Sequence, residues 1–180
     1  MCYSARLEVE ALLIVGDAAA KNSVVNLLHS FTAGSDTWLV FPLLGRDLFS
    51  LVHNSAKEHL PQHAIRSISY QLCCAVAFLH SKFIVHTDIK LDNIVFVDRA
   101  INKPEDLRTR AATIKIIDLG CCIKGTWGMP EAEFEVSARP YRAPEVVRGV
   151  VWSSKVDVWS LGLILYEMHT LCNPFWSLYD

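Results

Sequence analysis

The sequence has 180 residues, 52% of them hydrophobic, and a formal net charge of −2 at pH 7. This length suffices for one domain with a substantial core, and the small net charge gives no general attraction to nucleic acid or anionic lipid. No apolar run is long enough to span a bilayer, and Arg6, Glu8 and Glu10 before the first such run argue against a signal peptide. We therefore expect no direct nucleic-acid partner and no membrane association.

Cysteine usage indicates the compartment. Six cysteines occur, four of them in the adjacent pairs Cys73-Cys74 and Cys121-Cys122. Adjacent cysteines are poorly placed to bond to each other, and the sequence contains no C-x-x-C. Free thiols in a reducing compartment are favoured over a metal site, which indicates the nucleus or the cytoplasm.

The first part of the chain predicts a helix, two strands and a short helix, over residues 7–15, 24–28, 37–41 and 48–53. Apolar residues recur at helical spacing in the first segment, and Gly16 follows it as a stop signal. The two strands are joined by turn signals at 32–36, which favour an antiparallel hairpin. Pro42 lacks an N–H and ends the second strand, and 43–47 connects it to the short helix.

The second part predicts a long helix that begins at Pro61, two strands and a final helix, the last three over residues 94–97, 113–117 and 156–170. The long helix carries one apolar stripe, formed by Ile65, Ile68, Leu72, Val76 and Leu79. We expect the polar segment 98–112 to be a surface insertion that joins the two strands of a hairpin, and 120–137 to be an exposed loop. The final helix is apolar nearly all round, which is typical of a helix in the middle of a domain, with Val158, Trp159 and Tyr166 in the core. The helices that should cover it are not found in the sequence, so we also expect exposed apolar area on it.

Polar side chains gather in one short segment directly before the strand at 94–97. Asp88, Lys90 and Asn93 lie in this segment, and a second carboxylate, Asp118, ends the next strand. Strands that deliver a carboxylate and a carboxamide at their ends offer hard oxygen ligands, which suit Mg²⁺ and its phosphate partners. The sequence therefore predicts a site for a metal ion and phosphate groups.

The order and spacing of these residues resemble the protein kinase family. The segment around Asp88 is similar to the catalytic loop of kinases, and Asp118-Leu119-Gly120 is similar to their metal-binding D-F-G turn. Ala143-Pro144-Glu145 and Asp157-Val158-Trp159-Ser160 follow in the family's order. A lone Asp and Lys would more simply form a solvated salt pair, so the joint pattern carries the resemblance.

This resemblance implies an α+β, protein-kinase-like fold. It has a partial N-lobe, with one helix and short antiparallel strands, and an incomplete, mainly helical C-lobe. The whole of 1–180 would be one partial kinase domain. Its parts would be an N-lobe remnant at 1–41, a hinge at 42–47 and a C-lobe at 48–180 that runs through the central helix.

The resemblance also implies the chemistry, a transfer of the γ-phosphate of ATP to Ser, Thr or Tyr hydroxyls of protein substrates, with Mg²⁺ as cofactor. Asp88 would accept the hydroxyl proton, and Lys90 would neutralise charge on the transferred phosphate. Asn93 would hold one Mg²⁺, and Asp118 would hold the Mg²⁺ that bridges the phosphates.

Nucleotide-binding positions follow from the same resemblance. Phe41 would guard the back of the pocket, and the backbone of Pro42 and Leu44 would bond to adenine. Val95 would lie under the adenine ring, while Glu8 matches the helix glutamate that pairs with a phosphate-binding lysine. An ordinary exposed helix glutamate is the alternative for Glu8, because that lysine is not in this sequence.

A narrower resemblance points to the LAMMER-type, or CDC-like, dual-specificity kinases. It is carried by Thr87, where most kinases have Arg, by the insertion at 98–112 and by the segment 137–145. It implies Ser/Arg-rich splicing factors as protein substrates. Because residue 87 has no guanidinium to grip a phosphate, we expect activity that does not depend on phosphorylation within 121–137.

Some family features are not found in the sequence. No Gly-rich loop or V-A-I-K strand precedes Glu8, so we expect a domain truncated at both ends. Ala138 stands where relatives usually have a threonine whose hydroxyl contacts the catalytic Asp. Two functions therefore compete, an active kinase and a catalytically silent remnant that acts as a binding module or reflects an incomplete gene model. The retained Asp88 and Asp118 favour descent from an active enzyme.

Overall fold

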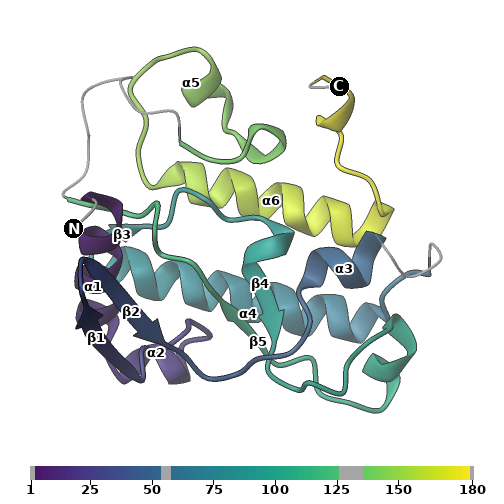
Figure 1. The fold of residues 1–180 in the computed structure, drawn as a ribbon. Helices are drawn as coiled ribbons and strands as arrows, with labels where there is room; N and C mark the ends of the chain where they lie inside the picture. The colour runs from purple at the N-terminus through teal and green to yellow at the C-terminus, as the bar shows by residue number, and fades with distance from the viewer. Residues whose placement is uncertain (1–2, 54–57, 126–135, 179–180) are drawn as a thin grey trace.

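The computed structural model describes residues 3–53, 58–125 and 136–178 (Figure 1). Its helices are α1 (Tyr3–Val15), α2 (Ala18–Lys21), α3 (Leu48–His53), α4 (Gln62–Ser81), α5 (Pro144–Val147) and α6 (Lys155–Thr170). Its strands are β1 (His29–Ala33), β2 (Asp36–Val40), β3 (Ile84–Val85), β4 (Ile94–Phe96), β5 (Ile114–Ile116) and β6 (Ile123–Lys124). The 3-10 turns are η1 (Leu91–Asn93), η2 (Pro104–Arg108), η3 (Arg139–Tyr141) and η4 (Trp176–Leu178). Within the described residues the strands pair antiparallel as β1–β2, β3–β6 and β4–β5, so the α+β class is confirmed.

Two long helices, α4 and α6, run side by side through the middle of the molecule, and α1 lies with the β1–β2 hairpin at one end (Figure 1). The four predicted helices are all confirmed. The first begins earlier than predicted, at Tyr3, and α3 has the predicted bounds. Helix α4 begins directly after Pro61, whose missing N–H costs little at that position.

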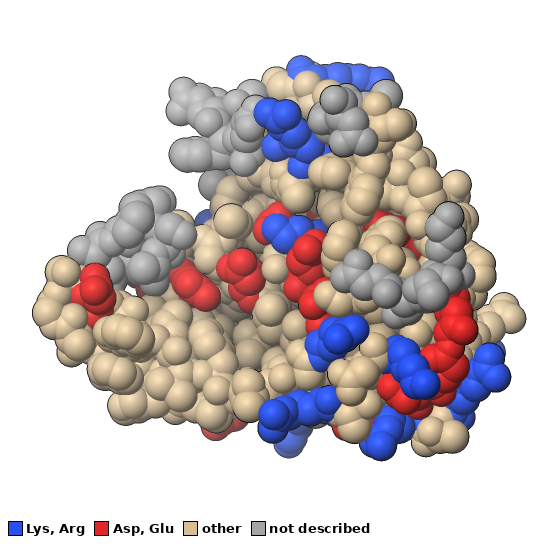
Figure 2. Space-filling view, turned by 45° about the vertical axis from the view of Figure 1, so that its right-hand side comes forward, with Lys and Arg blue, Asp and Glu red and all other residues tan. Residues whose placement is uncertain are grey.

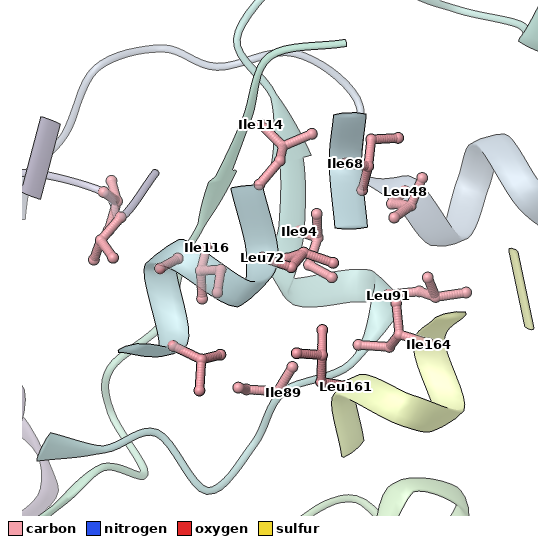
Figure 3. Close-up of a cluster of buried hydrophobic side chains, with 14 of the residues drawn as sticks. Leu48, Ile68, Leu72, Ile89, Leu91, Ile94, Ile114, Ile116, Leu161 and Ile164 are labelled. Atoms are coloured by element: carbon pink, nitrogen blue, oxygen red, sulfur yellow. The ribbon is translucent and has the colours of Figure 1, made fainter. Parts of the chain in front are cut away.

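The core forms where the apolar stripe of α4 meets the β4–β5 pair and α6. All five residues of the predicted stripe are buried: Ile65, Ile68, Leu72, Val76 and Leu79. Figure 3 shows α4 side chains beside those of the strand pair and of α6, among them Leu72, Ile94, Ile114 and Ile164. Helix α4 contacts β5, the strand that precedes Asp118, and β5 pairs with β4, the strand that follows Asn93. The core thus brings the two predicted halves of the site together.

The first hairpin lies further along the chain than predicted. The strand predicted at 24–28 is wrong, because the paired strand is β1 and the turn is only Gly34 and Ser35. Gly34 has φ +64°, a conformation that favours glycine. Val25 is instead buried next to β5, where its N–H donates to the carbonyl of Ile116 over 2.9 Å. Val24 and Val25 are therefore buried next to β5, whereas Leu28 is 58% exposed and its N–H donates to the carbonyl of Val40 in β2 over 2.8 Å.

Two segments that were expected to be exposed also contribute to the core. In the insertion at 98–112, Ile101 and Leu107 are fully buried, so the prediction of a surface segment is wrong there. In the loop at 120–137, β6 pairs with β3 and Cys122 is buried, while 126–135 lie outside the described residues. One or two apolar residues in a polar segment leave no periodicity, although they are enough to close a core.

Helix α6 is buried on one face only. Ile164 is fully buried, whereas Val158, Trp159 and Tyr166 are 48%, 37% and 49% exposed. The predicted core positions are therefore wrong for these three residues, while the exposed apolar area expected on this helix is confirmed, because the described elements pack against a single face of it. Neither α6 nor any other helix in the described part of the chain is long and apolar enough to cross a membrane.

Candidate active site

The segment before η1 is anchored to helix α6 through Asp157. The backbone N–H groups of His86 and Thr87 each donate to the Asp157 carboxylate over 2.9 Å. His80 of α4 contacts the same carboxylate through Nε2 at 2.8 Å, and Asp157 is only 1% exposed. A buried carboxylate that accepts three hydrogen bonds holds its donors firmly, because any unpaired partner would carry a large desolvation cost.

Thr87 lies in the left-handed region with φ +65°, which is rare for a β-branched residue. Its hydroxyl donates to the carbonyl of Cys121 over 2.7 Å. This bond joins the segment that carries Asp88 to the residue that follows Asp118-Leu119-Gly120. The unusual backbone at 87 is thus held by Asp157 on one side and by the second site segment on the other.

The Asp88 carboxylate is held at both oxygens. Lys90 Nζ donates to Oδ2 over 2.7 Å, and Asn93 Nδ2 donates to the same oxygen over 3.2 Å and to the Asp88 carbonyl over 2.9 Å. The backbone N–H of Ala138 donates to Oδ1 over 3.2 Å. A carboxylate has about four lone-pair positions. Among the described residues Oδ1 accepts one hydrogen bond, so one of its lone-pair positions stays open.

The charge of Lys90 is stabilised by the acidic groups around it. Burial alone would lower the pKa of Lys90, but the hydrogen bond and charge of Asp88, with the charges of Asp92 and Asp118, raise this pKa overall. Lys90 therefore stays protonated at neutral pH. The charges of Asp88 and Asp118 both raise the pKa of Lys90, so the two carboxylates lie close enough to act on the same amino group.

His86 links the Asp88 segment to β5. The backbone N–H of Asp88 donates to Nδ1 of His86 over 3.2 Å, so Nε2 is assigned the ring proton and donates to the carbonyl of Ile117 over 3.1 Å. Ile117 directly precedes Asp118, and its own N–H donates to the carbonyl of Asn93 over 2.9 Å. The two halves of the site are therefore joined by direct hydrogen bonds.

Asp118 has φ +64°, and its Oδ1 accepts a hydrogen bond from Gly120 N–H over 3.0 Å. A Cβ on Gly120 would lie 3.0 Å from this oxygen and 3.6 Å from Oε2 of Glu8, so a side chain here would crowd both acids. Burial, and next the negative charge of Asp118, raise the pKa of Glu8 above its usual value. Two carboxylates that oppose each other in this way favour the approach of a cation.

A cavity of about 320 Å³ opens next to Asp118. Its lining residues are Glu8, Val25, Phe41, Pro42, Leu44, Val95, Ile117 and Asp118. The structure thus gathers all five residues predicted to bind nucleotide, and Asp118, around one cavity of a size usual for small-molecule sites. Asp88, Lys90 and Asn93 lie on the adjoining segment and do not line it.

The donor groups next to the cavity fit Mg²⁺ bound together with phosphate groups. Figure 2 shows acidic side chains in a row across a hollow on one face of the molecule, with a basic side chain among them. No group of three or more His, Cys, Asp or Glu in the described residues could hold a metal ion by itself. Mg²⁺ often uses one or two protein oxygens and completes its shell with water and phosphate oxygens. Asp118 offers a carboxylate. Asn93 offers its Oδ1 as a ligand atom, because Nδ2 is the atom that donates to Asp88.

Sequence reasoning missed three contributors to the site. Val25 lines the cavity, although it was assigned to a hairpin strand, and Ile117 could have been found as the neighbour of Asp118. The N–H of Ala138 contacts Asp88, and a backbone donor leaves no sign in the residue type.

The prediction of free thiols is confirmed for Cys73, Cys74, Cys121, Cys122 and Cys172.

The chain is similar to known proteins over nearly its whole length. Residues 5–179 match the model of the protein kinase domain. The probable dual specificity protein kinase madd-3 of Caenorhabditis elegans is 38% identical over 174 residues, which are 93% of this chain and 19% of that protein. The human dual specificity protein kinase CLK2 is 33% identical over 175 residues, 92% of this chain and 34% of that protein.

A plant protein shows the same level of similarity. The serine/threonine-protein kinase AFC2 of Arabidopsis thaliana is 33% identical over 181 residues, which cover 93% of this chain. The chain spans 42% of that protein and 19% of madd-3, so it matches less than half the length of these relatives.

Proposed function

The chain belongs to the protein kinase family and is related to the dual-specificity, LAMMER-like branch, and on that premise we propose that it transfers the γ-phosphate of ATP to hydroxyl groups of proteins. The observation that supports this most directly is the environment of Asp88. Its Oδ2 accepts hydrogen bonds from Lys90 and Asn93, its Oδ1 accepts one from Ala138, and a cavity lies next to Asp118. A firmly held Asp88 carboxylate, together with a cavity lined by Asp118, supports this proposal.

In this proposal each side chain has one task. Asp88 accepts the proton of a Ser, Thr or Tyr hydroxyl at the open position of Oδ1. Lys90, kept protonated by the surrounding acids, neutralises charge near the transferred group. Asn93 and Asp118 would hold Mg²⁺, which would offset the negative charge of the phosphate groups when ATP is bound.

The cavity residues support the nucleotide part of the proposal. The apolar side chains of Phe41, Leu44 and Val95 line the cavity, as a flat aromatic base requires. The carbonyl of Pro42 and the N–H of Leu44 would orient that base. Glu8, at the other side, faces Asp118 and belongs to the region where cations would gather. The lobes would then meet at the hinge 42–47, between 1–41 and 48–180.

The acidic hollow also bears on the substrate. A row of acidic side chains attracts basic polypeptides at a distance. We therefore propose basic protein segments, of which Ser/Arg-rich splicing factors are the best match to the LAMMER-like resemblance. The free thiols agree with the nucleus or the cytoplasm as the site of action.

One observation favours a second candidate, a module that binds nucleotide or protein without transfer. The cavity lining contains two acidic residues, Glu8 and Asp118, and no lysine or arginine among the described residues. Tight binding of a triphosphate then depends strongly on Mg²⁺. Nucleotide binding without any phosphoryl transfer would support this candidate over the enzyme.

Replacing Asp118 by Asn should separate these possibilities. We expect transfer from γ-labelled ATP to a Ser/Arg-rich peptide to fall by about 100-fold, with a higher Mg²⁺ requirement, because the carboxylate that offsets the metal charge is lost. The exposed Asp17→Asn variant is the matched control. Equal rates in the Asp118→Asn variant and the unaltered chain would contradict the proposed metal site.

A second expected result concerns regulation. Because Thr87 carries no guanidinium and instead bonds to the Cys121 carbonyl, phosphatase treatment should leave the transfer rate unchanged within about twofold. The rate would be measured before and after treatment, with phosphate removal verified by mass spectrometry. A large loss of activity after treatment would show that phosphorylation orders the site by another route.

A further inference from the structure

The peptide group between Ser137 and Ala138 lies between a cation and the Asp88 carboxylate. Its N–H, from Ala138, donates to Asp88 Oδ1 over 3.2 Å. Its carbonyl, from Ser137, accepts from Arg142 Nε over 3.3 Å and from Arg142 Nη2 over 3.0 Å. One amide group thus carries a guanidinium at its oxygen end and a carboxylate at its nitrogen end.

This alignment strengthens both hydrogen bonds. A positive charge at the carbonyl oxygen polarises the amide and makes its N–H a better donor, so the two bonds support each other. The two N–H groups of Arg142 also fix the plane of the peptide, because they reach one oxygen from a rigid planar fork. The direction in which the Ala138 N–H points is therefore set by Arg142.

The local backbone needs such support. Ser137 has φ +69°, a left-handed conformation that costs energy for a residue with a side chain. Its own hydroxyl does not provide the support, since Oγ is buried and has no hydrogen-bond partner within the described part of the chain. The side chain of Ala138 has no polar group at all. Arg142 holds the carbonyl end of this peptide group, and Asp88 accepts the hydrogen bond from its N–H end.

We propose that Arg142 is a positioning residue for Asp88, which acts through the Ser137–Ala138 peptide group. The inference deepens the proposed function, because it explains how this chain orients the proposed base where residue 138 offers no hydroxyl. It places no contact between Arg142 and substrate. Loss of Arg142 should therefore affect the geometry of the base and leave nucleotide affinity in place.

The first test observes the amide itself and needs no turnover. In ¹⁵N-labelled protein, the Ala138 amide proton should resonate downfield because it is bonded to a carboxylate, and it should move upfield in Arg142→Gln. The neighbouring, exposed Arg139→Gln is the control and should leave that resonance unchanged. The rest of the spectrum reports whether each variant is folded. A folded Arg142→Gln variant with an unshifted Ala138 resonance would overturn the proposal.

The second test is kinetic. In Arg142→Gln we expect kcat to fall by about 100-fold with KM for ATP nearly unchanged, the effect of a base displaced by a fraction of an ångström to 1 Å. Arg142→Lys keeps the positive charge but not the planar guanidinium, so its kcat should lie between those of Arg142→Gln and the unaltered chain. A change in KM alone would overturn the positioning role. If the unaltered chain shows no transfer, the proposed function fails, while the amide resonance still decides the role of Arg142.

Discussion

Phosphoryl transfer by the Asp88→Asn variant is expected to be about 1,000-fold slower than by the unaltered chain. Asn has the shape of Asp but cannot take up the hydroxyl proton, so the proposed base is removed with little change in volume. One of its two terminal atoms would also become a donor, facing either Lys90 Nζ or the Ala138 N–H, which now donate to the carboxylate. Initial rates with γ-labelled ATP and a Ser/Arg-rich peptide would measure the effect.

The matched control is an aspartate outside the site. Asp17 is exposed and has no part in the proposed site, so Asp17→Asn makes the same chemical change away from Asp88. Its rate should stay within about threefold of the unaltered chain, as expected for a surface substitution. If Asp88→Asn and the unaltered chain transfer phosphate at the same background rate, the chain is not a kinase under these conditions, and the binding-module candidate gains support.

The largest effect on stability is expected for Asp157→Ala. This substitution leaves the N–H groups of His86 and Thr87 buried without an acceptor, and it removes the partner of His80. Breaking a buried network from one side typically costs about 3–5 kcal/mol. Urea unfolding followed by circular dichroism would measure the change in the free energy of unfolding.

Two further variants make this second experiment specific. Asp157→Asn keeps one carbonyl acceptor and should fall between Ala and the unaltered chain, while the exposed Asp92→Ala should change stability by less than about 0.5 kcal/mol. A single hydrogen bond typically contributes about 1 kcal/mol to stability. If Asp157→Ala lowers the free energy of unfolding by less than about 1 kcal/mol, the Asp157 network does not anchor the segment.

Much of the site could be predicted because its side chains are bound to recognisable elements. Asp88 and Asn93 precede the short apolar strand β4, and Asp118 follows β5, which pairs with β4 and packs on the periodic face of α4. Once that face is read correctly, the two polar segments must meet. The same holds for Phe41 and Val95, which line one cavity although they are far apart in the sequence.

What could not be predicted depends on backbone groups and on isolated residues. The contact from Ala138 to Asp88 uses an N–H that every residue other than proline possesses. The position of Val25 depends on pairing with β5 and not on its own strand propensity, which suits a hairpin equally well. Ile101 and Leu107 close the core from a polar segment in which no period is visible.

The Asp157 network has a consequence for how the molecule moves. Local opening of a segment is cheap when its backbone bonds face water and few buried groups hold it. The segment that carries Asp88 is the reverse case, since its amides end on a buried carboxylate that also contacts α4 through His80. Opening this segment would strip two hydrogen bonds from a buried carboxylate and leave two backbone N–H groups without an acceptor, which carries a large cost. We therefore expect the segment that carries Asp88 to be held as firmly as the core beside it.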